Sequence, residues 1–182
     1  YADHKGKFLG DWGAPHKRKE FGGSPEAEYF NNCVYAMNLA DVIRIAAILK
    51  RPEDVARYQP VLDQLRQDIH RHFYDEARGV YSKGTQVQQA FALLTGVVPE
   101  DLRPAIKDKL VESLSRKKAY LDIGSSGLPV LFKYLTEQSD RPDLVYAPLS
   151  RTDHPSYGYF LEQGESTWPE YWRINEASCI PD

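Results

Sequence analysis

The sequence predicts an all-α protein made of helical hairpins that form part of an (α/α)6 barrel, a toroid of paired helices. Three observations predict this class. Helices that are apolar almost all the way round alternate with amphipathic ones, strand-type alternation is nearly absent, and the apolar helices begin at unequal spacings, near residues 29, 86 and 128. An apolar helix must be surrounded by other helices, whereas an amphipathic helix has one wet side. The unequal spacing argues against a regular solenoid with a period of about 34 residues.

The first predicted helix begins at a cap followed by a proline. Ser24 precedes Pro25 and two acids, Glu26 and Glu28, and this order is typical of a helix N-terminus. The helix continues to about Leu49 with apolar residues over most of its circumference. We therefore expect an inner helix.

The second predicted helix follows Arg51-Pro52 and is amphipathic. Its apolar residues recur every three or four positions as far as Phe73, on a charged background. Pro60 should kink or split it, since proline removes a backbone donor. His70 and His72 are expected to be solvated.

The same alternation continues along the rest of the chain. A turn-rich stretch at 75–85 precedes an apolar helix at 86–94 and an amphipathic helix at 101–115. A Gly/Ser loop at 122–127 follows, and then two further helices at 128–135 and 142–149. We expect one partial barrel domain over 1–182. It divides into an opening loop at 1–25, helical hairpins at 26–150 and an aromatic and acidic segment at 151–182.

Composition excludes several classes of protein and partner. The chain has 182 residues, 42% of them hydrophobic and 27% charged, which is ordinary globular composition. A net charge of −3 without a basic block argues against nucleic acid as a partner. The longest apolar run, Ile45–Leu49, is far too short for a membrane span. Cys33 and Cys179 make no metal-ligand spacing, so we expect no metal and no cofactor.

The segment from Arg151 to Trp172 is the main candidate for chemistry. It places Tyr157, Trp168 and four other aromatic rings among acids, with Gly and Pro at the turns. Sugar rings pack their C–H faces on aromatic rings and donate hydroxyls to carboxylates, so this composition fits a carbohydrate site. Glu170, between two Trp-containing phrases, is the best candidate for a catalytic carboxyl group. A structural lid over a helical core fits the same composition.

Three further candidates each allow a structural role beside a functional one. Asp11, next to Trp12 in the opening loop, is a sugar ligand or, as its residue type favours, a cap or turn residue. Asp122 lies beside glycines ahead of an inner helix and is a pocket contact or an N-cap. His154, between Asp153 and Pro155, is a sugar ligand or a turn residue.

An ordered set of phrases resembles a known family. They are Gly10-Asp11-Trp12, the helix from Tyr29 through Leu49 to Asp54, Gly84-Thr85-Gln86, Val98-Pro99-Glu100, Leu121-Asp122-Ile123-Gly124, Thr152 to Tyr159, and Gly164 to Glu170. In this order and over residues 8–172, the chain resembles the (α/α)6-barrel domain of the α-L-rhamnosidases, glycoside hydrolase family 78.

The resemblance implies an inverting hydrolase that acts on terminal α-L-rhamnosyl residues of a carbohydrate substrate. Glu170 matches the family's general base. Six residues fall where family members line the rhamnose pocket: Asp11, Trp12, Asp122, His154, Tyr157 and Trp168. The remainder of the chain's own barrel is an implied partner.

The sequence departs from the family pattern in several places. Nothing corresponds to the acid-rich motif that carries the family's general acid upstream of Gly10, nor to a histidine-bearing stretch after the base. The family usually has Trp-Glu where this chain has Trp168-Pro169-Glu170, and Trp is common at the position of Tyr157. We therefore expect a C-terminal part of the barrel that is inactive as an isolated chain.

Two other interpretations stay open at the level of the sequence. One is a different (α/α)-barrel carbohydrate enzyme, such as another glycosidase or a polysaccharide lyase that uses Tyr157 or His154 as its base. The other is a non-catalytic helical interaction module, in which Glu170 points to solvent and an apolar groove binds a protein partner.

Overall fold

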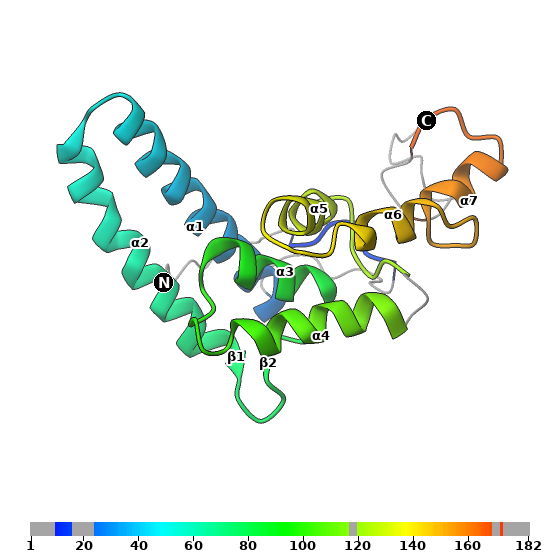
Figure 1. The fold of residues 1–182 in the computed structure, drawn as a ribbon, viewed down its shortest axis with the longest axis horizontal. Coiled ribbons are helices and arrows are strands. Elements are labelled where there is room, and N and C mark those ends of the chain that lie inside the picture. The colour runs from blue at the N-terminus through cyan, green and yellow to red at the C-terminus, as the bar shows by residue number, and fades with distance from the viewer. Residues whose placement is uncertain (1–9, 16–23, 117–119, 169–171, 173–182) are drawn as a thin grey trace.

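Helices make up most of the described structure. The computed structural model describes residues 10–15, 24–116, 120–168 and 172. Its elements are α1 (Pro25–Ile48), α2 (Pro52–Phe73), β1 (Tyr74–Asp75), β2 (Val80–Tyr81), α3 (Gln86–Thr95), α4 (Arg103–Arg116), α5 (Leu128–Glu137), α6 (Asp143–Leu149) and α7 (Tyr157–Glu162). The prediction of an all-α protein is confirmed (Figure 1).

α1 begins where the cap sequence predicts. The Ser24 hydroxyl accepts a hydrogen bond from the backbone N–H of Ala27 at 3.2 Å, and Pro25 occupies the first turn. Both acids of this turn, Glu26 and Glu28, lie at the positive end of the helix dipole. The N-terminus of α1 is therefore fixed by local sequence.

α2 rules out the split that was one of the two expectations for Pro60. One continuous helix runs through this residue, so it does not split the segment. Pro60 is exposed, and the carbonyl that loses its N–H partner there lies on the wet side of an amphipathic helix, where water can replace the missing donor. The apolar face of α2, which carries Leu62, Leu65, Ile69 and Phe73, is buried as the pattern predicts.

A short antiparallel hairpin joins α2 to α3. Tyr74 pairs with Tyr81 and Asp75 with Val80. The chain then enters α3 at Thr85, whose backbone N–H donates to Gln88 Oε1 at 3.1 Å, and it leaves through Gly96 at φ +70°. Both ends of α3 are thus set by their own sequence.

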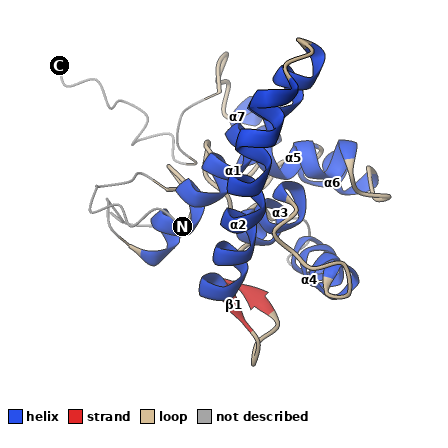
Figure 2. Cartoon of the chain, turned by 90° about the vertical axis from the view of Figure 1, so that its left-hand side faces the viewer, coloured by secondary structure: helices blue, strands red, loops and turns tan. Residues whose placement is uncertain are grey.

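α3 lies at the centre of the described structure and packs against α1, α4 and α5. Every residue of α3 except Leu94 is buried, as expected for an inner helix. α2 and α4 cover α1 and α3 from the outside, as Figures 1 and 2 show. The order of inner and outer helices follows the predicted alternation.

The far end of α1 departs from the expectation of an inner helix surrounded by others. In Figure 1 the α1–α2 hairpin extends away from the other helices, and its tip is coloured cyan. Val42, Ile45, Ile48 and Leu49 are exposed there, Ile48 to 72%. We call these four residues the apolar ridge. Nothing in the described residues packs over them, because α3 and α5 are much shorter than α1.

α7 was not expected from the sequence, where residues 151–172 were interpreted as loops. Its N-cap Ser156 accepts a hydrogen bond from the N–H of Tyr159 at 3.1 Å, and Phe160 is buried. Gly158 obscured the pattern because glycine disfavours helix interiors. It is needed because a Cβ there would lie 2.1 Å from the carbonyl oxygen of Arg151. Within the described ranges, no helix is both long and apolar enough to cross a bilayer.

Candidate active site

The first turns of the inner helices gather at one end of the described structure. The Tyr29 hydroxyl of α1 donates to the carbonyl of Gln88 in α3 at 2.6 Å, and the rings of Phe30 and Phe91 pack edge to face at 4.8 Å. The segment that leads into α5 bonds to the first residue of α3, Gln86. Positive ends of several helix dipoles therefore face the same region, which favours carboxylates and other oxygen acceptors.

Asp11 is held at this end by the backbone ahead of α5. Its Oδ2 accepts the N–H of Gly124 and its Oδ1 the N–H of Gly127, both at 2.9 Å. The carboxylate is buried and satisfies two donors at the start of α5. Asp11 thus acts as a cap for the start of α5, although Gly124 and Gly127 lie 113 and 116 residues further along the chain.

Trp12 follows directly and is attached by its backbone. Its carbonyl accepts the N–H of Ser125 at 2.8 Å and the hydroxyl of Ser125 at 3.3 Å. Gly124 passes so close that a Cβ on it would lie 1.9 Å from the carbonyl oxygen of Trp12. Only glycine lets the 10–15 segment lie against loop 120–127.

Asp122 and Gln86 bind each other reciprocally. The N–H of Gln86 donates to Asp122 Oδ1 at 3.2 Å, and the N–H of Asp122 donates to Gln86 Oε1 at 3.1 Å. The Gln86 amide also donates to the carbonyl of Tyr120 at 2.8 Å, and Gln86 is completely buried. Asp122 therefore caps α3, and Gln86 fixes the loop that carries it. Sequence reasoning missed Gln86 because its partners lie more than 30 residues away.

We expect Gln86→Met to loosen loop 120–127 in the full-length protein. The side chain keeps its volume but leaves the Asp122 N–H and the Tyr120 carbonyl without partners, at about 1–3 kcal/mol for such a buried group. Hydrogen–deuterium exchange should speed up in this loop, while Gln86→Glu, which retains the acceptor, should have a smaller effect. Gln138→Met, at an exposed amide, is the control. Unchanged exchange in the loop would contradict this role.

Trp172 joins the C-terminal segment to the same loop. Its indole N–H donates to the carbonyl of Ile123 at 2.6 Å, and the ring is buried against Phe160 at 6.0 Å. Its own carbonyl accepts a hydrogen bond from Nε2 of His154. Loop 120–127 thus contacts the opening loop, the start of α3 and the C-terminal segment.

The aromatic candidates lie together beside Trp172. Tyr157 packs against Trp168 at 4.2 Å and Trp172 at 5.5 Å between ring centroids. Tyr157 is half-buried, and this burial raises the pKa of its hydroxyl group. Trp168 is 62% exposed and offers an open indole face. His154 packs edge to face on Tyr159 at 5.3 Å.

A polar cluster borders these rings. The Tyr120 hydroxyl donates to Asp153 Oδ2 at 2.6 Å, and Arg151, 4.0 Å above the Tyr120 ring, also binds this carboxylate. The hydrogen bond from Tyr120, followed by the Arg151 charge, lowers the pKa of Asp153. The same bond raises the pKa of Tyr120. Asp153 therefore stays ionised beside His154.

Glu26 is a buried carboxylate that the sequence did not mark as a site residue. Lys83 Nζ lies 2.5 Å from its Oε1, and its side chain is only 7% exposed. Burial by itself raises the pKa of Glu26, but hydrogen bonds from Lys83, its own backbone and Ser24 outweigh burial and lower it. Glu26 lines a small cavity together with Asp11 and Asp122. Its position in the first turn of α1 was the available signal.

The described residues enclose only a small polar cavity at this end of the structure. The cavity between Asp11, Glu26 and Asp122 measures about 10 Å³, which is room for about one water and far less than a sugar needs. Glu170 lies outside the described residues. Its neighbours in sequence, Trp168 and Trp172, both pack on Tyr157. Among the described side chains, no three His, Cys, Asp or Glu residues are arranged to hold a metal ion.

Comparison with known proteins links this arrangement to one family. The model of the bacterial α-L-rhamnosidase six-hairpin glycosidase domain matches residues 1–179. The α-L-rhamnosidase of Alteromonas sp. (strain LOR) is 29% identical over 170 residues, which are 90% of this chain and 18% of that protein. The chain therefore spans less than a fifth of the length of this relative.

Solved structures give the same fold. The Streptomyces avermitilis α-L-rhamnosidase complexed with L-rhamnose superposes with a TM-score of 0.77 at 26% identity, over 90% of this chain and 15% of that one. The Aspergillus terreus α-L-rhamnosidase superposes with a TM-score of 0.82 at 18% identity, over 95% of this chain and 20% of that one. These matches confirm the predicted fold class, part of an (α/α)6 barrel. They do not favour the lyase or the interaction module.

Proposed function

Because the chain belongs to the family of bacterial α-L-rhamnosidase six-hairpin glycosidase domains, we propose that it forms part of the catalytic domain of a glycoside hydrolase. The reaction is inverting hydrolysis of terminal α-L-rhamnosyl residues. This chain contributes the general base, Glu170, and one wall of the sugar pocket. The rest of the barrel contributes the general acid and the opposite wall.

The observation that carries the proposal is the set of contacts made by loop 120–127. The loop bonds to Asp11 and Trp12 through Gly124, Ser125 and Gly127, and to Trp172 through Ile123. Trp172 in turn contacts Tyr157 and His154, and Tyr157 contacts Trp168. All six residues proposed for sugar binding, including Asp122 in the loop itself, therefore belong to one connected network, although they come from segments up to 157 residues apart.

The chemistry requires two carboxyl groups on opposite sides of the glycosidic bond. In an inverting hydrolase one protonates the leaving oxygen and the other removes a proton from water, and they stand about 6.5–9.5 Å apart to leave room for that water. Glu170 takes the proton from water in this scheme. The exposed indole of Trp168 packs on the C–H face of the sugar. The carboxylate of Asp122 and the ring of His154 bind hydroxyl groups of the sugar.

The test is turnover of an aryl α-L-rhamnoside by the full-length protein, followed by ¹H NMR. We expect release of L-rhamnose whose first-formed anomer is β, because attack by water inverts the anomeric centre. Absence of hydrolysis would refute the rhamnosidase assignment. An α anomer formed first would refute the inverting mechanism.

Trp12→Ala should weaken sugar binding while the fold persists. Loss of one aromatic face that packs on a sugar is expected to lower L-rhamnose affinity roughly tenfold, for about 1.5 kcal/mol. The backbone attachment through Ser125 remains, so the circular dichroism spectrum should not change. Tyr146→Ala, which removes an exposed ring on α6, is the matched control. Titration calorimetry with unchanged affinity would return Trp12 to a packing role.

A further inference from the structure

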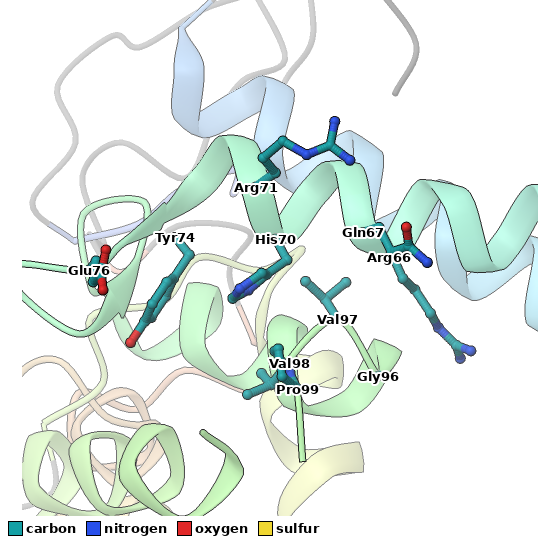
Figure 3. A pocket seen from close by; sticks show the side chains of 10 residues that line it. All are labelled: Arg66, Gln67, His70, Arg71, Tyr74, Glu76, Gly96, Val97, Val98 and Pro99. Carbon is teal, nitrogen blue, oxygen red and sulfur yellow. The ribbon is translucent and has the colours of Figure 1, made fainter. Parts of the chain in front are cut away.

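A second cavity lies on the outside of the described structure, between the C-terminal half of α2 and the turn after α3. Its volume is about 590 Å³, within the range of small-molecule sites. Figure 3 shows the residues that line it: Arg66, Gln67, His70, Arg71, Tyr74, Glu76, Gly96, Val97, Val98 and Pro99. None of them belongs to the candidate active site.

The two sites lie at opposite ends of α3. The active-site residues Gln86 and Asp122 meet at its first residue, whereas the cavity contains Gly96–Pro99, which follow its last residue. Ten residues of helix separate these ends, or about 15 Å at roughly 1.5 Å per residue. A ligand in this cavity therefore does not occupy the active site.

Several polar side chains at the cavity have no partner among the described residues. They are the amide of Gln67, the hydroxyl of Tyr74 and the carboxylate of Glu76. Gln67 and Glu76 are both exposed, so their polar groups can turn to a ligand without disturbing the core. Together the Gln67 amide and the Glu76 carboxylate supply two hydrogen-bond donors and several acceptors.

His70 adds a ring nitrogen, Nε2, whose orientation is fixed. Its Nδ1 lies 2.7 Å from the Tyr81 hydroxyl, and its ring stacks on Tyr74 at 5.0 Å. Burial lowers the pKa of His70, so the ring is neutral at pH 7, and burial raises the pKa of Tyr81, which keeps its proton. Nε2 carries the hydrogen when the Tyr81 hydroxyl donates to Nδ1, and it is an acceptor when this hydroxyl donates to the carbonyl of Val97, 3.5 Å away, and Nδ1 donates to Tyr81. Sequence reasoning placed this histidine in solvent; in the structure it is half-buried.

The charges at the cavity do not add up to an anion site. Arg71 lies 3.2 Å from Asp68, and Arg66 lies 3.8 Å from Asp63 and donates to the carbonyl of Thr95 at 2.8 Å. Glu76 adds a negative charge. Both guanidinium groups are thus engaged by acids or backbone of the protein itself, and a ligand carboxylate would meet Glu76 as a like charge.

The opposite wall is apolar. Val97, Val98 and Pro99 line it, and Pro99 exposes most of this apolar surface, because each valine is only 3% exposed. Figure 3 shows the ring of His70, on α2, and the ring of Tyr74, the first residue of β1, facing this turn. A ligand that fits has hydroxyl groups on one side and C–H groups on the other, and carries no net charge. These are the properties of a pyranose.

We propose that this cavity binds a neutral pyranose unit of a saccharide, at a site separate from the active site. Gln67, His70 and Glu76 bind its hydroxyls, and the half-buried Pro99 packs on its C–H face.

The experiment measures saturation-transfer NMR from the full-length protein to methyl β-D-glucopyranoside and methyl α-L-rhamnopyranoside. The protein carries Trp12→Ala, so that binding at the active site is weakened. Gln67→Ala together with Glu76→Ala should reduce the signal of at least one neutral glycoside fivefold or more. Gln64→Ala, on the same helix but outside the cavity, should leave it unchanged.

Three results would overturn the proposal: no signal before the double substitution, an equal signal after it, or stronger binding of D-glucuronate than of both neutral glycosides. The last result would make the cavity an anion site. Turnover of an aryl α-L-rhamnoside is a separate measurement, so failure of the hydrolase assignment and failure of this second site are distinguishable.

Discussion

Glu170→Gln in the full-length protein is expected to lower kcat for an aryl α-L-rhamnoside by about 10²- to 10⁴-fold, the range that a positioned general base contributes. Glutamine keeps the size and the hydrogen-bonding shape of the side chain but cannot accept the proton of the attacking water. KM should stay nearly constant, because substrate binding does not depend on the basicity of this group.

A control variant and a rescue experiment make this test more specific. Glu162→Gln changes an exposed glutamate at the end of α7 in the same segment and should leave kcat unchanged. A small anionic nucleophile such as azide can replace activated water, so azide should partly rescue Glu170→Gln. Turnover of Glu170→Gln close to that of the unsubstituted protein would remove Glu170 from the mechanism.

Gly124→Ala should detach the opening loop from the site. The added Cβ would lie 1.9 Å from the carbonyl oxygen of Trp12 and 2.7 Å from the backbone nitrogen of Ala14. Both atoms belong to the backbone, so the loops must separate. Overpacking costs about 1–3 kcal/mol, and each buried group of Asp11 or Gly127 left without a partner adds about 1–3 kcal/mol. We expect a local loss of about 3 kcal/mol or more.

The measurement is hydrogen–deuterium exchange of residues 10–15 and 120–127, together with L-rhamnose affinity. Exchange should rise by about 100-fold in both segments, as expected for about 3 kcal/mol, and sugar binding should fall with it. Ser126→Ala, on the exposed side of the same loop, is the matched control. Protection of both segments at the level of the unsubstituted protein would show that the loops accommodate a methyl group and that their close contact is unimportant.

Local patterns predicted the helices well. The cap at Ser24, the amphipathic repeat of α2 and the apolar stretch at 86–94 are all short-range signals, and the structure has helices there. Errors arose where context outweighs propensity. α2 continues through Pro60 because that position is exposed. α7 contains Gly158, which is required by the close passage of Arg151 and not by the helix itself.

The candidate site was predictable only in part. Residue types and their order marked Asp11, Asp122 and the aromatic segment. The bonds that unite them, from Asp11 to Gly124 and from Gln86 to Asp122, join positions 113 and 36 residues apart and leave no periodic trace in the sequence. Glu26 was predicted only as an acid of the first turn of α1, yet it is buried beside Asp11 and Asp122.

The apolar ridge at the tip of the α1–α2 hairpin bears on how this polypeptide is handled in the laboratory and in the cell. The four aliphatic side chains of the apolar ridge are in contact with water, and exposed apolar patches of this kind promote self-association at micromolar concentrations. Expression of these 182 residues alone should therefore give oligomers or inclusion bodies. During synthesis the apolar ridge must be covered by other helices of the barrel soon after the α1–α2 hairpin forms. The yield of folded protein therefore depends on how fast the barrel closes.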